Sequence, residues 1–240
     1  MAGIVAAAGA FSILMAVRPA NAQQLATLKV LSGSVSVSVQ GAAVAAATDG
    51  MSVKAGDVVE TGDPGRAVVR YFDGSETRLD SNTRFEVREL HTLPNKAQSK
   101  VIRGKQTKGA TFNRIVKLTD SQSRVQTEAP TSTASVRGTA YSGTSNADGT
   151  FTWRVFEGAI KVTDSFGKSV IVKAGQGVIV DEDGRLLEVY DLSDEELQAE
   201  WVTFNNCKLD GMGCPQVLDD KQTGGPGTPT DEPQGPQGPQ

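Results

Sequence analysis

Apolar and polar residues alternate with period two along most of this chain, and that pattern limits the fold more than any other feature. Val35 and Val37 alternate with serines, and Phe151 and Trp153 alternate with polar residues in the same way. Period two is the repeat of a β-strand with one buried face. Helical spacing is missing over residues 28–190, so that region is predicted to consist of strands.

The turns between these strands are marked by short motifs in which an aspartate precedes a glycine. Such pairs suit backbone positions with positive φ, where glycine meets no steric penalty. Many short strands with closely spaced turns predict an all-β domain of sandwich, barrel or solenoid type. The motifs are Asp49-Gly50, Asp63-Pro64-Gly65, Asp73-Gly74, Asp148-Gly149 and Asp183-Gly184.

An internal echo favours the solenoid. Residues 30–37 and 155–162 share the spacing V-x-x-G-x-[VI]-x-V, and an identical Val-Lys-Ala-Gly follows at 53–56 and at 172–175. Repeated strand-turn units are expected where successive coils stack on one another. We therefore predict a twisted, β-solenoid-like stack of short strands.

The C-terminal part changes character. Ser193 and Glu196 have the spacing of a capping box, and apolar residues then recur at helical spacing, which predicts one short helix near 194–204 with Trp201 packed on the β core. From Thr223 the chain is rich in Gly, Pro and Gln and is expected to be a disordered tail. The expected domains are 1–22, a signal peptide; 28–190, the β domain; 191–222, a short helix and Cys loop; and 223–240, the tail.

The N-terminal stretch has the features of an export signal. Residues 1–17 are apolar or small, and Ala20 and Ala22 form the small-x-small pattern that signal peptidases cleave, so cleavage is expected after Ala22. The alternative is an uncleaved membrane anchor, but a bilayer core needs about 20 apolar residues and this run is shorter. We expect a periplasmic or extracellular protein.

The two cysteines fit an oxidising compartment. Cys207 and Cys214 are separated by a segment with two glycines, which allows the chain to turn back. A disulfide is the favoured state of such a pair after export. The alternative is two free thiols. A zinc site would need two more ligands, and His91 is the sole histidine.

Catalytic constellations are missing from the sequence. His91 is the one imidazole, and no nucleophile elbow, phosphate-binding loop or dinucleotide fingerprint is present. We therefore predict no enzyme, no metal site and no cofactor.

Charge is unevenly distributed behind a formal net charge of −4. Residues 84–124 hold ten Lys and Arg against three acids, whereas residues 181–220 hold two against twelve. The basic stretch could dock an anionic polymer or an acidic partner, pair with the acidic segment of the same chain, or be a solvated face. It lacks interleaved aromatic residues, so we expect no nucleic-acid binding. The candidate basic contact surface is Lys100, Arg103, Lys105, Lys108, Arg114 and Lys117.

Taken together, residues 28–180 resemble the FecR domain family of bacterial extracytoplasmic proteins. The resemblance implies a twisted, β-solenoid-like all-β domain. The motifs that support it are Val30-Leu31-Ser32-Gly33-Ser34-Val35, Gly56-Asp57-Val58-Val59-Glu60-Thr61-Gly62, Phe72-Asp73-Gly74-Ser75, Val125-Gln126-Thr127-Glu128-Ala129-Pro130-Thr131, Arg137-Gly138-Thr139 and Glu157-Gly158-Ala159-Ile160-Lys161-Val162.

Signalling members of that family receive a signal from an outer-membrane transporter and relay it to an extracytoplasmic-function sigma factor. This sequence departs from their pattern, because no helical segment precedes the apolar run and the C-terminal part is short. We therefore expect an exported, non-catalytic binding or scaffold module of the cell envelope, whose partner is an envelope protein or an anionic cell-surface polymer. The alternatives are a divergent component of sigma-factor signalling and, third, a carbohydrate-processing β-solenoid enzyme.

Two roles are open for the family motif Arg137-Gly138-Thr139. Arg137 could be a buried arginine whose guanidinium bonds backbone carbonyls, which we favour, or it could be a surface recognition point.

Overall fold

The computed structural model describes residues 24–39, 44–94, 96–199 and 205. The expected signal peptide, the cysteine pair, Trp201 and the tail lie outside these residues. Within the described part, no helix is both long and apolar enough to cross a membrane.

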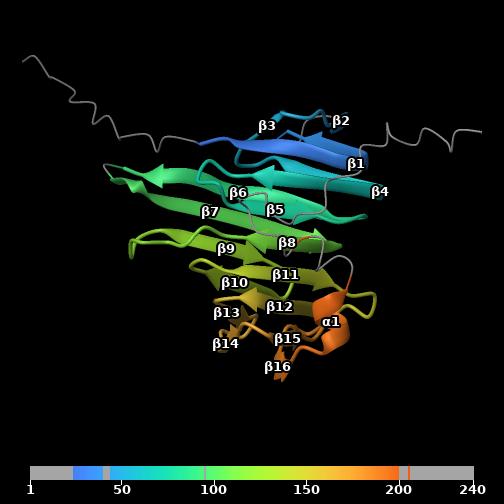
Figure 1. The fold of residues 1–240 in the computed structure, drawn as a ribbon, viewed down its shortest axis with the longest axis vertical. Helices are drawn as coiled ribbons and strands as arrows, with labels where there is room; N and C mark the ends of the chain where they lie inside the picture. Colours follow the sequence, from blue (N-terminus) through green and yellow to red (C-terminus); the bar gives the residue numbers. More distant parts are fainter. Residues whose placement is uncertain (1–23, 40–43, 95, 200–204, 206–240) are drawn as a thin grey trace, which may run out of the picture.

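The described chain forms sixteen β-strands in one sheet and one short helix, α1 (Asp194–Gln198), which confirms the all-β class (Figure 1). The strands are β1 (Ala26–Ser38), β2 (Val44–Ala46), β3 (Ser52–Val53), β4 (Val58–Arg70), β5 (Glu76–Leu79), β6 (Arg84–Leu93), β7 (Lys96–Lys108), β8 (Ala110–Arg114), β9 (Arg124–Glu128), β10 (Ser132–Val136), β11 (Ala140–Ser145), β12 (Phe151–Glu157), β13 (Ala159–Asp164), β14 (Ser169–Lys173), β15 (Gln176–Val180) and β16 (Leu186–Asp191).

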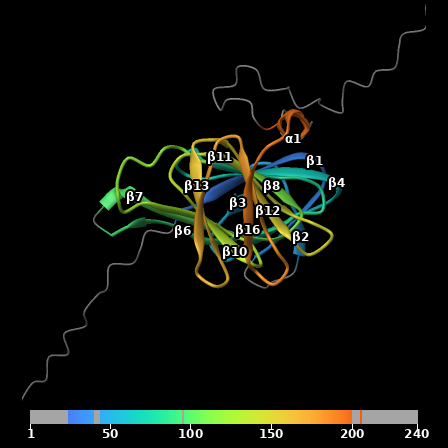
Figure 2. The ribbon, with the colours of Figure 1, turned by 90° about the horizontal axis from the view of Figure 1, so that it is seen from below.

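The sheet is folded over at β4 into two limbs. The N-terminal part of β4, from Val58 to Glu60, pairs with β6, whereas Ala67–Arg70 pairs with β5. The open limb continues from β6 through β7, β9, β10 and β13 to β14, and the covered limb from β5 through β8, β11, β12 and β15 to β16. Described strand pairs are antiparallel except β7 with β9. Strands β1–β3 lie at one end of the molecule and β14 and β16 at the other (Figure 1); Figure 2 views it from that second end.

The chain passes between the limbs at stacked glycine corners. Gly109 joins β7 to β8, Gly138 joins β10 to β11, and Gly158 joins β12 to β13, all with positive φ. A Cβ on Gly158 would lie 2.9 Å from the carbonyl oxygen of Gly138, so neighbouring corners lie directly against each other. Gly33 and Gly158, the matching glycines of the sequence echo, both have this conformation.

The hydrophobic core fills the space between the limbs. Trp153 is fully buried there, with ring centroids 4.7 Å from Phe151 and 6.1 Å from Tyr141. Because the inner side chains come from strands of both limbs, the polar atoms among them bond across the core. These bonds join Trp153 Nε1 to Ser132 Oγ at 2.9 Å, Tyr141 Oη to Thr127 Oγ1 at 2.7 Å, and Gln106 Nε2 to the Gly143 carbonyl at 3.1 Å.

The helix α1 and Asn205 both contact the outer face of the covered limb. The capping box of Ser193 and Glu196 is confirmed, and Glu196 also accepts a hydrogen bond from Arg154 Nε on β12 at 2.8 Å. Arg78 Nη1 on β5 donates to Asn205 Oδ1 at 3.3 Å. The helix α1 ends at Gln198, because Ala199 has a non-helical ψ of 137°; residues 200–204 of the predicted helix lie outside the described part of the chain.

Candidate interaction surface

The outer face of the open limb presents an array of polar side chains. Strand alternation turns the apolar residues of β9 and β10 into the core and leaves every second side chain outside. The strand registers align these outer residues in two rows across β7, β9 and β10. We call this array the polar face; its rows are Arg103, Gln126 and Ser135, and Lys105, Glu128 and Thr133.

Arg103 lies at the centre of an ion-pair network on this face. Its Nη1 donates to Glu89 on β6, and its Nη2 lies 2.5 Å from Glu128 Oε1 on β9. Partial burial alone would lower the pKa of Arg103, but the hydrogen bonds to Glu128 and Glu89 outweigh it and raise the pKa. The guanidinium therefore lies between two carboxylates, one on each neighbouring strand.

The polar face is hollowed by a shallow groove of about 530 Å³. Its lining includes Ser135, whose Oγ accepts a 3.1 Å hydrogen bond from Gln126 Nε2, and Thr133 beside it. A second hollow of about 530 Å³, lined by His91 and Arg124, shares Arg103 and Gln126 with the first. The two hollows therefore adjoin, and the lining of the second also includes the apolar residues Leu93 and Val101.

The structure does not bring the six predicted basic residues together. Arg103 and Lys105 lie on the polar face, but Arg114 is on the covered limb, 3.4 Å from Glu157. Lys100 is paired with Asp73 at 2.5 Å, and its side chain is 14% exposed.

The other two basic residues are also apart from the polar face. Lys108 lines a hollow beside β2, and Lys117 is exposed next to Gly138. The predicted surface is thus divided between limbs, because strands neighbouring in sequence, such as β7 and β8, belong to different limbs.

The family motif lies at the turn between β10 and β11. Arg137 is exposed, not buried, and its Nη2 donates to the carbonyl oxygen of Asp120 at 2.5 Å. Thr139 is buried, and its Oγ1 donates to the Ala159 carbonyl at 3.0 Å. Both side chains bond backbone carbonyls of neighbouring segments, and Gly138 sits between them with φ +121°.

The described residues hold no cluster of three His, Cys, Asp or Glu side chains that could bind a metal ion. His91 is half-buried on β6 at the border of the polar face.

Sequence reasoning did not identify Gln126, Thr133 and Ser135 as surface residues that lie together. The signal was the alternation of short polar residues with apolar ones in 124–136, which showed that their side chains share faces but not which strands are neighbours.

Comparisons with known proteins were made for the sequence and for the fold. No curated protein matches the chain. Two crystal structures of a candidate anti-sigma factor from Parabacteroides distasonis ATCC 8503 are similar in fold: one at 2.50 Å with a TM-score of 0.49 and 16% identity, the other at 1.65 Å with a TM-score of 0.47 and 15% identity. Each comparison covers 61% of this chain and 64% of the other, so the chain spans less than two thirds of those relatives.

The family model described as FecR protein matches residues 57–161. This range includes all six residues of the polar face and the Arg137-Gly138-Thr139 corner. Residues 57–161 of this chain are therefore a FecR domain.

Proposed function

We propose that this chain is an exported, non-catalytic FecR-like module of the bacterial cell envelope, and that its polar face binds a protein partner. One observation supports this most: among the residues that the structure describes, α1 and Asn205 bond to the outer face of the covered limb, whereas a groove on the outer face of the open limb is lined by strand and turn residues of that limb. The polar face also lies within the FecR match.

A protein partner is favoured over an anionic cell-surface polymer by the charge balance of the face. Arg103 is neutralised by Glu89 and Glu128 and stands next to a row of uncharged hydroxyls and amides. A polyanion would need a dense set of unpaired cations. Mixed donors and acceptors instead suit a polar protein surface.

For the whole chain we propose a signal peptide at 1–22, the β domain at 28–190, a helix and Cys loop at 191–222 and a tail at 223–240. The stacked glycine corners support a twisted, β-solenoid-like arrangement for the β domain.

The second candidate function is a divergent component of transmembrane signalling to an extracytoplasmic-function sigma factor. The FecR match itself favours it. Deleting the gene and measuring transcription from sigma-dependent promoters distinguishes the two: a change supports signalling, and unchanged transcription with retained partner binding supports the module.

The Ser135→Arg variant tests the binding role of the polar face. A bulky arginine in the middle of the groove would hold a partner away from the surface, so we expect at least about a tenfold loss of captured partner. Tagged full-length chain is used to capture proteins from envelope extract, and the amount of each is measured by quantitative mass spectrometry.

Ser52→Arg is the matched control. Ser52 is exposed on β3, at the end of the molecule farthest from β14, so this variant should capture the partner as the unmodified chain does. Equal capture by both variants would show that the polar face is not the binding surface.

A further inference from the structure

The strand β14 is a regular and exposed edge of the sheet. It stands last in the order of the described strands, and among these it pairs only with β13, through five residue pairs without a register shift. The opposite edge strand, β16, has an irregularity in its pairing, between Val178 and Val180 on β15. Irregularities of this kind protect edges from further pairing, and β14 has none.

Along β14, the backbone N–H and C=O groups of successive residues point alternately toward β13 and toward the free edge. Asp164 N donates to the Lys168 carbonyl and Ala174 N to the Gly158 carbonyl, both at 2.9 Å. The hydrogen-bonded pairs between these two ends therefore involve residues 170 and 172 on β14. The N–H and C=O groups of Ser169 and Ile171 consequently point away from β13.

The free hydrogen-bonding groups of this edge stop before the N–H of Lys173. Its N–H is already used, because it donates to Gln176 Oε1 at 3.2 Å. The part of the edge that can accept another strand is therefore centred on Ser169 and Ile171.

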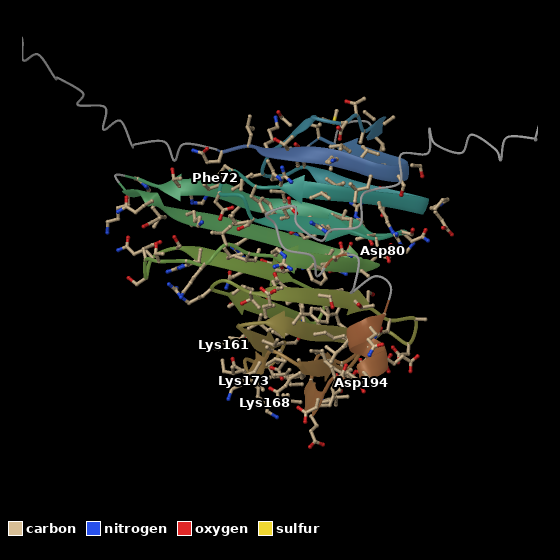
Figure 3. The ribbon with its side chains drawn as sticks, in the orientation of Figure 1. Phe72, Asp80, Lys161, Lys168, Lys173 and Asp194 are labelled. Carbon is tan, nitrogen blue, oxygen red and sulfur yellow. The ribbon has the colours of Figure 1, made fainter. Side chains whose placement is uncertain are left out.

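The outer face of this edge carries Ser169, Ile171 and Lys173 next to Lys161 of β13, and the inner face is apolar. Ile171 is 54% exposed and lies opposite Lys161 of β13, and Lys173 is exposed beside it. Val170 and Val172 point inward and contact the core. Lys161 and Lys173 make no ion pair with any residue that the structure describes, and Figure 3 shows them on the same side of the molecule together with Lys168.

We propose that the β14 edge binds an extended, acidic peptide segment of a protein partner as an added strand. The bonds would run from the outward groups of Ser169 and Ile171 to the peptide backbone. Peptide side chains on the outer face would be carboxylates beside Lys173 and Lys161, and those on the inner face would be apolar and extend the contacts of Val170.

This inference goes beyond the proposed function and is tested with purified protein. The probe is a seven-residue peptide that alternates Glu and Val, added to the full-length chain at low salt. Hydrogen exchange at single amides should show at least about tenfold slower exchange at Ser169 and Ile171. Val170 and Val172, already bonded to β13, should change little. A peptide that alternates Lys and Val should give no protection.

Charge variants provide the second measurement. Lys161→Glu combined with Lys173→Glu should weaken binding of the Glu-Val peptide by about tenfold. Lys29→Glu, an exposed lysine on β1 at the far end, should leave it unchanged.

Three outcomes would overturn the proposal: no protection at Ser169 and Ile171, equal binding by the double variant, or protection that grows with protein concentration when no peptide is present, which indicates self-pairing. None depends on capture from envelope extract, so the polar face and the β14 edge can fail separately.

Discussion

Replacing Trp153 by alanine is expected to lower the free energy of unfolding by about 4 kcal/mol, the largest effect of any single truncation among the residues that the structure describes. Trp153 is fully buried between the limbs and contacts Phe151 and Tyr141. The substitution leaves a cavity. It also removes the Nε1–H group that donates a hydrogen bond to Ser132 Oγ. Urea unfolding followed by circular dichroism measures the change.

Phe166→Ala is the control for aromatic truncation. Phe166 is 66% exposed, and its ring lies beneath the guanidinium of Arg185 at 5.5 Å. Removing it should cost no more than about 1 kcal/mol. If both variants lost the same stability, the core between the limbs would not be the main source of stability.

The Gly138→Ala substitution is expected to lower the free energy of unfolding by about 3 kcal/mol, because two effects add. The backbone there has φ +121°, which a residue with a side chain adopts only with strain. The new Cβ would also lie 2.6 Å from Lys117 Cα, a backbone atom that cannot move without shifting its segment. The same unfolding measurement checks this value.

Gly167→Ala separates the two reasons. Gly167 also has positive φ, +83°, but a Cβ there meets nothing within 4 Å. The free energy of unfolding of this variant should fall by about 1 kcal/mol, because only the conformational strain acts there. A Gly138→Ala variant no less stable than Gly167→Ala would mean that the corners are not tightly stacked.

The strands could be predicted from sequence because their cause is local. Alternation at Phe151 and Trp153 requires only that one face of the strand be buried, and β12 buries both side chains. The capping box is equally local: Ser193 and Glu196 are three residues apart and bond each other's backbone amides.

The arrangement of the candidate site could not be predicted, because it depends on strand order. Arg103 and Glu128 are 25 residues apart, and they meet only because β7 and β9 are parallel neighbours. The intervening β8 lies on the other limb, which takes Arg114 away from the basic residues next to it in sequence. Counting charges along the sequence therefore identified a basic segment. It did not identify Glu128, which pairs with Arg103 only in the folded sheet.

The limb folding also explains why the polar face was missed. Gln126 and Ser135 are neighbours across β9 and β10, but the groove also needs β7 and β13 beside them. Short-range patterns contain no information on that order.

Site-specific cross-linking tests the central claim most directly. A photo-reactive amino acid at Thr133 on the polar face, with a matched one at exposed Thr27 on β1, is introduced into the full-length chain and activated in intact cells. We expect one protein to be cross-linked from Thr133 and not from Thr27. A partner that cross-links from Thr27 and not from Thr133 would contradict the assignment of the polar face as the binding surface.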